Sequence, residues 1–407
     1  MAFMIDHARL TDIDELLKLY FSIYGNTYPI AYGTDPKKMA ETISSDHFRW
    51  VVTRESERQL IVASTVYELD LLNRVGKLTA LVVHPEYRKH NLALNLVKEG
   101  EKGLLDRDGP LNTIYTTTRT NSVGPQLVCL RAGYVPLGIF PNAHKLGDYE
   151  TTTLLAKFRP GVLETRPAPG PIPAKLGPIY RALHAMPELA TVLGPVPPTL
   201  EASPAPVAPV SSGLPPASPR ELEFEMFYAP EFVRKRFHEI FLDPYDRFFP
   251  FHQPNLLVAA KDGSVEVYAH LSKPDRYCAI VALTQPIHSL GGRMRKFLAQ
   301  VHDEGISYVE VLIGIEHTAS IETLLNAQFL PSALYPGFRT VEGRAHDFVI
   351  MTRTMEPLDF RGMAVEQRFK PFIDQYVDLW KRMHLDTLQI FNVPAPSDQE
   401  EEAHGDA

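Results

Sequence analysis

A strand, a basic turn and a helix follow one another in residues 81–98, which read LVVHPEYRKHNLALNLVK. The strand is expected to end at Val83 and the helix to begin near Leu92. Backbone N–H groups and the positive end of the helix dipole meet at such a turn and form a ready anion site. The local chemistry is therefore pyrophosphate binding, and the alternative is an ordinary βα turn with solvated basic residues. The turn carries three such residues: Arg88, Lys89 and His90.

This stretch resembles the acyl-CoA loop of the Gcn5-related N-acetyltransferases (the GNAT family), Arg/Gln-x-x-Gly-x-Gly/Ala after V-H-P-x-Y-R. Here the lead is V-H-P-E-Y-R and the loop is R-K-H-N-L-A, so Arg88 and Ala93 match and Asn91 replaces the middle glycine. Asn is the non-glycine residue that best tolerates a left-handed backbone. Further along, Asn121, a helix over Gln126–Ala132 and then A-G-Y-V-P-L-G resemble the family's L-G-F-x-x-x-G ending. The resemblance covers roughly residues 3–158.

The resemblance implies transfer of an acetyl or other short acyl group from acyl-CoA to a primary amine, without a metal. The last strand residues would pair with the pantetheine arm as an added strand does. A backbone N–H at the splay between this strand and the strand over Thr113–Thr118 would stabilise the tetrahedral oxyanion. The implied cofactor-binding residues are Leu81, Val82, Val83, Arg88, Lys89, His90, Asn91, Leu92, Ala93 and Asn121.

The groups that would move protons are less conventional. Many family members have a Glu five residues before the His of V-H-P and a Tyr four residues before the terminal Gly. These positions are Thr79 and Cys129 here. A thiol with a pKa of about 8.5 could protonate a leaving thiolate, but a buried Cys on a helix is more often core packing.

Three other side chains are candidates. Glu68 and Asp70 share one face of a strand at i and i+2, as substitute bases or as solvent-side charges. Tyr115 lies on the splayed strand, where it either acts in catalysis or only packs. Without a dedicated base, positioning of an already neutral amine with water as proton acceptor is a further option.

The elements around the loop predict an α/β fold with a mixed central sheet flanked by helices, in the order β-α-β-β-β-α-β-α-β-β. A second segment repeats the later part of this order but lacks the acyl-CoA loop. Its turn, TQPIHSLGGRMRK, carries two glycines and two arginines that form either an anion site or a flexible turn. This degenerate GNAT-like half is expected either to shape the acceptor pocket or to form a homodimer. Its apolar cluster Phe248–His252 is expected to pack, with an acceptor wall as the alternative.

Proline divides the chain. Sixteen of its 35 prolines lie between Pro160 and Pro219, where they predict a stiff linker, with one short helix that docks on a neighbour. The expected units are residues 1–160 (GNAT-like, acyl-CoA-binding), 161–220 (linker), 221–357 (degenerate GNAT-like), 358–392 (amphipathic helix) and 393–407 (disordered acidic tail).

Composition limits the function. The 407 residues are 44% apolar and 22% charged, with a net charge of −8, which disfavours nucleic acid and anionic membranes as partners. Only two cysteines occur, so a reducing cytoplasm is expected. No zinc, P-loop or nucleophile-elbow motif occurs. The expected partner is a small-molecule amine. Protein lysines or N-termini, and a non-catalytic acyl-CoA sensor or scaffold, are the alternatives.

Overall fold

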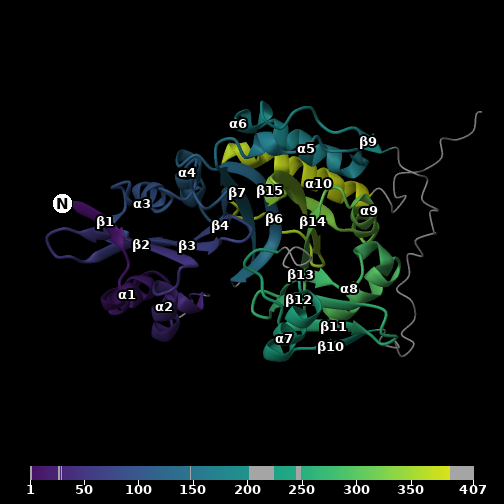
Figure 1. Cartoon of the computed structure of the whole chain (residues 1–407), viewed down its shortest axis with the longest axis horizontal. Helices are drawn as coiled ribbons and strands as arrows, with labels where there is room; N and C mark the ends of the chain where they lie inside the picture. Colours follow the sequence, from purple (N-terminus) through teal and green to yellow (C-terminus); the bar gives the residue numbers. More distant parts are fainter. Residues whose placement is uncertain are drawn as a thin grey trace, which may run out of the picture.

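The computed structural model describes residues 2–25, 28, 30–146, 148–200, 224–243 and 249–385. The Pro- and Ala-rich stretch after residue 200 and the acidic tail lie outside these residues. Figure 1 shows the first half of the chain, in purple and blue, beside the second half, in green. Among the described helices, none combines the length and the apolar character needed to cross a bilayer.

The first half has the strand and helix order that the sequence predicts, with one additional helix, α2. Its elements are β1 (Phe3–His7), α1 (Ile13–Tyr24), α2 (Pro36–Ile43), β2 (Phe48–Glu55), β3 (Ile61–Asp70), β4 (Val75–Val83), α3 (Leu92–Gly100), β5 (Thr113–Arg119), α4 (Gly124–Arg131), β6 (Val135–Leu146) and β7 (Asp148–Phe158).

The second half repeats this whole order rather than only its later part. Its elements are β10 (Phe224–Phe227), α7 (Pro230–Ile240), β11 (Leu256–Ala260), β12 (Glu266–Ser272), β13 (Tyr277–Leu283), α8 (Arg293–Asp303), β14 (Tyr308–Gly314), α9 (Thr318–Asn326), β15 (Leu330–Val341) and β16 (Arg344–Thr354). The mixed α/β class predicted from the sequence is therefore confirmed for both halves.

The two halves share a single 14-stranded sheet. Its order is β1-β2-β3-β4-β5-β7-β6-β15-β16-β14-β13-β12-β11-β10, so it reads the same way from either end. The halves meet where Gly138 of β6 pairs with Ala333 of β15, and these are equivalent positions of the two units. A Cβ on Gly138 would overlap the backbone of Ser332 and Ala333, so only glycine permits this approach.

The segment between the halves packs against the second one. Helix α5 (Gly177–His184) contacts α10 (Lys370–His384) and β15, and Figure 1 shows the two helices together above the sheet. Ile179, Tyr180 and Leu183 bury the apolar face of α5. At the start of the segment, Arg166 forms an ion pair with Asp347, and both side chains are 4% exposed. The short helix expected in this segment therefore docks on its neighbour.

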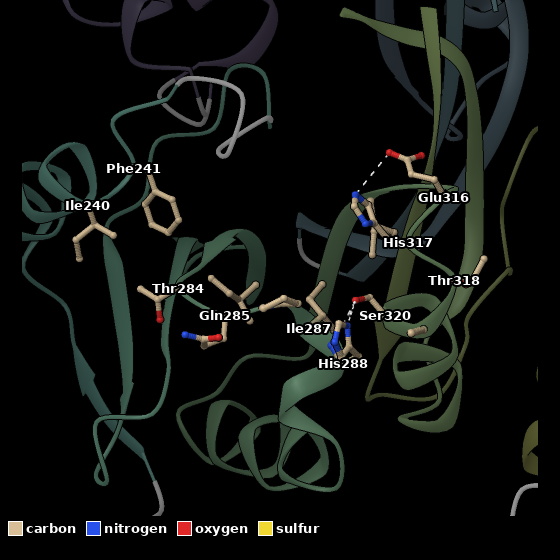
Figure 2. A pocket seen from close by; sticks show the side chains of 14 residues that line it. Ile240, Phe241, Thr284, Gln285, Ile287, His288, Glu316, His317, Thr318 and Ser320 are labelled. Atoms are coloured by element: carbon tan, nitrogen blue, oxygen red, sulfur yellow. Dashed lines mark hydrogen bonds and ion pairs between the residues drawn. The ribbon is translucent and has the colours of Figure 1, made fainter. Parts of the chain in front are cut away.

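A pocket opens in the second half beyond the last paired residues of β13 and β14 (Figure 2). Its volume is about 810 Å³, within the range of ligand-binding pockets. It lies between the end of α7, the turn that follows β13 and the start of α9. The first half places its basic turn at the equivalent position.

Candidate active site

The basic turn of the first half lies where the sequence places it, between the end of β4 at Val83 and the start of α3 at Leu92. Lys89 and Asn91 both have positive φ, 71° and 55°, and Asn91 is the N-cap of α3. Asn91 therefore takes the left-handed conformation for which the aligned glycine is suited. This backbone turns the first amides of α3 toward the loop, as an anion site requires.

Aromatic packing holds this turn in place. Tyr87 is buried, and its ring lies 5.7 Å from His84 and 6.3 Å from Phe3. Leu92 is buried at the start of the helix. The side chains of Arg88, Lys89 and His90 are exposed, so the turn offers its positive charge to solvent.

Strands β4 and β5 diverge next to this turn. Their parallel pairing covers Val75–Lys77 of β4, so the strand extends past it to Val83. The pairing of β4 with β3 has a β-bulge just before Leu81–Val83, and Ala80 in this bulge has a φ of 53°. The polar edge of Leu81–Val83 faces the gap and can pair with an extended ligand that carries amides.

Several polar side chains lie on one face of the sheet, at the base of the gap between β4 and β5. Lys77 lies opposite Glu68 on β3 and opposite Tyr115 on β5, so the three side chains share a face. Thr79 lies two residues further along β4, on the same face. The Tyr32 hydroxyl donates to Glu68 Oε1 at 3.3 Å. Burial, and next the Glu68 carboxylate, raise the pKa of Tyr32 well above its usual value.

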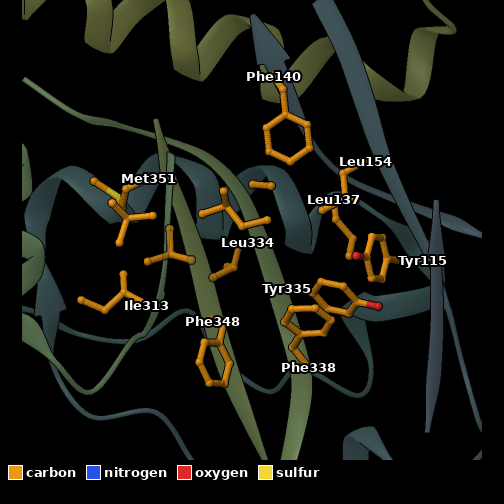
Figure 3. Close-up of a cluster of buried hydrophobic side chains, with 14 of the residues drawn as sticks. Tyr115, Leu137, Phe140, Leu154, Ile313, Leu334, Tyr335, Phe338, Phe348 and Met351 are labelled. Atoms are coloured by element: carbon orange, nitrogen blue, oxygen red, sulfur yellow. The ribbon is translucent and has the colours of Figure 1, made fainter. Parts of the chain in front are cut away.

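Tyr115 joins the two halves. It is 8% exposed, and its ring centroid lies 6.1 Å from Phe251, 6.1 Å from Tyr335 and 5.8 Å from Phe338 (Figure 3). Burial first, and then the carboxylate of Glu68, raise its pKa well above 10. The second half therefore closes over this face of the first, and Phe251 forms part of that wall.

The other two candidates lie in different surroundings. Asp70 accepts hydrogen bonds from the Asn73 backbone N–H at 3.0 Å and from its side-chain amide at 2.7 Å, so it caps the β3–β4 turn. Cys129 is 2% exposed on α4, and burial raises its pKa to about 12. Its environment is that of a core side chain. Asn121 is exposed in the connection between β5 and α4.

The second half contributes a partly buried chain of polar groups that was not predicted from the sequence. Tyr277 Oη lies 2.5 Å from Glu310 Oε1 and 3.2 Å from His252 Nε2. Glu310 is the third residue of β14, as Tyr115 is the third residue of β5, so the two are equivalent. The three residues come from three separate elements, and only an alignment of the two halves would have indicated Glu310.

Hydrogen bonds link the members of this chain of polar groups. His252 Nδ1 lies 3.0 Å from the carbonyl of Pro250, so Nδ1 carries a proton. The Tyr277 hydroxyl donates to Glu310 Oε1 at 2.5 Å, and the Tyr308 hydroxyl donates to Oε2 at 3.3 Å. Burial raises the pKa of Glu310, whereas burial and next the charge of Lys77 lower the pKa of His252 to about 3. Burial thus favours the neutral form of both groups, and the hydrogen bonds from the two tyrosines oppose this effect at Glu310.

Known proteins were compared with the chain. No family model matches it. The beta-lysine N(6)-acetyltransferase of Methanococcus maripaludis is 27% identical over 149 residues, which are 36% of this chain and 52% of the relative. The chain thus spans about half the length of this curated relative. The predicted relationship to acetyltransferases is confirmed by this match.

Solved structures also align with about two fifths of the chain. A GNAT-family acetyltransferase of Streptococcus pneumoniae is 17% identical over 39% of this chain and 99% of its own, with a TM-score of 0.33. The spermidine N-acetyltransferase of Vibrio cholerae, in complex with CoA and spermine, is 14% identical over 39% and 95%, also with a TM-score of 0.33.

Proposed function

We propose that the first half is an N-acyltransferase that moves an acetyl or other short acyl group from acyl-CoA to a primary amine of a small molecule. The observation that carries the proposal is the free edge of β4 beside a basic, left-handed turn at the start of α3. This pairing of features suits a ligand with amides at one end and phosphates at the other. The acetyltransferase relative supports the same chemistry.

The residues of the turn would hold the cofactor. Arg88 and Lys89 would neutralise the pyrophosphate, while the first amides of α3 would donate to it. The edge of Leu81–Val83 would hydrogen-bond the pantetheine amides, which brings the thioester toward the bulge at Ala80. A backbone N–H at this bulge would stabilise the oxyanion of the tetrahedral intermediate.

The amine would enter from the face that carries Glu68 and Tyr115. An ammonium ion has to lose a proton before its nitrogen attacks the thioester carbon, and the leaving thiolate has to gain one. Glu68 is the carboxylate of this face whose hydrogen bond, from Tyr32, leaves acceptor capacity for an ammonium. We assign it the role of anchoring the amine and accepting its proton, directly or through water. Asp70 and Cys129 are less suitable, because the turn and the core engage them.

The enclosure of this face favours a small acceptor over a polypeptide. Phe251 of the second half lies against Tyr115, and Tyr335 and Phe338 flank the ring on another side. An amine at the end of a flexible chain would fit such a wall better than a folded protein surface.

A second candidate is a non-catalytic acyl-CoA sensor, which the replacement of both usual proton-transfer groups by Thr79 and Cys129 favours. The test is release of free thiol from acetyl-CoA with a panel of mono- and diamines and with lysine-containing peptides. The proposal expects thiol release and a stoichiometric amide with at least one small amine. Tight CoA binding without thiol release above hydrolysis would support the sensor. Turnover confined to peptides would overturn the small-molecule acceptor.

A further inference from the structure

The pocket of the second half occupies the place that the acyl-CoA site has in the first. The parallel pairing of β13 with β14 ends at Ile280 and Val311. One wall of the pocket is the stretch Leu283–His288 that follows, and the opposite wall includes Ile313 and the start of α9. The gap thus forms between β13 and β14, which are the equivalents of the diverging strands β4 and β5.

The floor of the pocket is apolar and its upper part is polar. Phe241, Ile287 and Ile313 are buried beneath it. Ser320 is 5% exposed, and its Oγ lies 3.3 Å from the backbone N and 3.2 Å from Nδ1 of His288. Figure 2 shows His288 and Ser320 together, with Glu316 and His317 above them.

The backbone of β13 offers hydrogen bonds to this gap. The N–H of Thr284 donates to Glu266 of β12 at 3.0 Å, so it points away from the pocket. Backbone groups alternate in direction along a strand, so the N–H and C=O of Leu283 point toward the gap. An extended chain with secondary amides can pair there as an added strand does.

The described lining of the pocket offers no Lys or Arg charge to a phosphate. Among the described residues that line it, none is Lys or Arg, and Glu316 adds a carboxylate at the rim. The turn between β13 and α8 reads Ser289, Leu290, Gly291 and Gly292 where the first half has its basic residues.

The arginines after this turn are engaged elsewhere. Arg293 donates to Ser264 at 2.8 Å, pairs with Asp262 at 3.3 Å and lies over the ring of Phe224. Arg295 donates to the carbonyl of Asn326 at 3.0 Å. An anion site at this turn was one of two alternatives from the sequence. Neither Arg293 nor Arg295 has its guanidinium available for such a site.

We propose that this pocket is a second binding site, for an extended chain of secondary amides without phosphate. The β13 edge pairs with the amides, the apolar floor receives the carbon chain, and Glu316 disfavours anions. Such a chain occurs in phosphate-free pantetheine and in a short uncharged peptide. The site is independent of the activity proposed for the first half, since the residues that form it belong to the second half.

The test follows the methyl signals of Ile287 and Ile313, which line the pocket, in full-length protein labelled with 13C at isoleucine. Ile→Val substitution assigns them, and Ile114 in the core of the first half serves as a reference signal. Pantetheine, coenzyme A and N-acetyl-dialanine-amide are each added up to about 10 mM, which covers millimolar affinities.

The expected result is a saturable shift of both methyl signals with pantetheine, with the peptide or with both, and with CoA at best as effective as pantetheine. A response to one ligand alone identifies the source of the amides. Ala319→Trp, at an exposed position of the pocket wall, should abolish the shift. The proposal is overturned if neither amide ligand moves these signals, or if CoA saturates them at a concentration about tenfold lower than pantetheine. Both outcomes are read in the wild-type protein, so they do not depend on the folding of the variant.

Discussion

The two βα turns of this chain share a scaffold and differ in charge. In the first half, β4 leads through Arg88 and Lys89 into α3. In the second, β13 leads through Ser289 and Gly291 into α8. Each turn follows a strand that continues beyond the residues paired with its parallel neighbour. The backbone alone therefore provides a gap and a strand edge, and the side chains of the turn decide whether phosphate can bind.

A second contrast lies at the base of each gap. The third residue of β5 is Tyr115, and the third residue of β14 is Glu310. Tyr115 meets aromatic rings from the other half, whereas Glu310 is tied to Tyr277 and Tyr308 within its own half. On the face of Tyr115, Glu68 remains half-buried, whereas Glu310 is 8% exposed and is held by internal hydrogen bonds.

The largest expected effect concerns the junction that makes the two halves one sheet. Gly138→Val should reduce the free energy of unfolding by about 3 kcal/mol, because its side chain would overlap the backbone of Ser332 and Ala333. Urea unfolding measures it. Gly170→Ala, at a site with no atoms near an added Cβ, is the control with little expected change. Equal stabilities would show that the β6–β15 contact does not hold the halves together.

The next effect separates the polar faces of the two halves. Glu68→Gln should lower kcat/KM for the amine about a hundredfold, since a positioned base typically contributes that much. Glu310→Gln is the matched change in the second half and should alter kcat/KM far less, because the Glu310 carboxylate is held by Tyr277 and Tyr308. Steady-state thiol release measures both. If Glu310→Gln lowered kcat/KM as much as Glu68→Gln does, the placement of the base in the first half would be wrong.

Removing a positive charge from the turn of the first half should weaken only the binding of the cofactor. Arg88→Ala should weaken CoA binding about tenfold, the value of one charge-assisted hydrogen bond. Arg293→Ala, in the other turn, should leave CoA affinity unchanged, because Arg293 is paired with Asp262. The shift of the thermal midpoint with CoA concentration reports both affinities. If Arg88→Ala bound CoA as well as the wild type, the basic turn would not be the phosphate site.

The pH dependence of stability should differ between the equivalent residues Glu310 and Tyr115. Burial raises the pKa of Glu310, so the folded state favours its protonated form. That contribution is complete below the unfolded pKa of about 4.3 and is lost as pH rises through the folded pKa. The Glu310→Gln protein should therefore gain stability relative to the wild type as the pH rises above about 4.3.

Urea titrations of the two proteins at each pH isolate the carboxyl from the neighbouring His252, His144 and Lys77. Tyr115→Phe should give no such pH-dependent difference, since the pKa of Tyr115 lies well above 10. A constant difference between wild type and Glu310→Gln as the pH rises would contradict a raised pKa of Glu310.

The smallest difference between the two halves is expected in the reactivity of their cysteines, which should be alike. Burial raises the pKa of Cys129 and of Cys278 to about 12 each, so both thiols stay protonated at pH 8. Iodoacetamide should leave both unmodified in native protein and alkylate both in urea, as mass spectrometry would show. Selective alkylation of native Cys129 would restore the thiol as a candidate acid.

Much of the first half could be predicted because its signals are local. The period of its apolar residues indicated the strands and helices, and the V-H-P-E-Y-R lead placed the turn. β15 escaped prediction because Pro331, Pro336 and Gly337 make it look like a loop. The register shifts beside these residues, so they lie at bulges where a strand tolerates proline and glycine.

Contacts between distant residues left no such signal. The shared sheet depends on Gly138 meeting Ala333, and the Glu310–Tyr277–His252 chain comes from three separate elements. No periodicity within one segment reports either arrangement. The basic turn was predictable from sequence, but its counterpart in the second half was recognisable as a pocket only once the strands were in place.

The central claim is that the two equivalent gaps differ in whether they accept phosphate. A crystal structure of the full chain with coenzyme A tests it most directly. We expect the pyrophosphate at the turn of Arg88–Asn91, with the pantetheine arm along Leu81–Val83, and no phosphate in the pocket between β13 and β14. A pyrophosphate bound in that pocket, with the first-half turn empty, would contradict it.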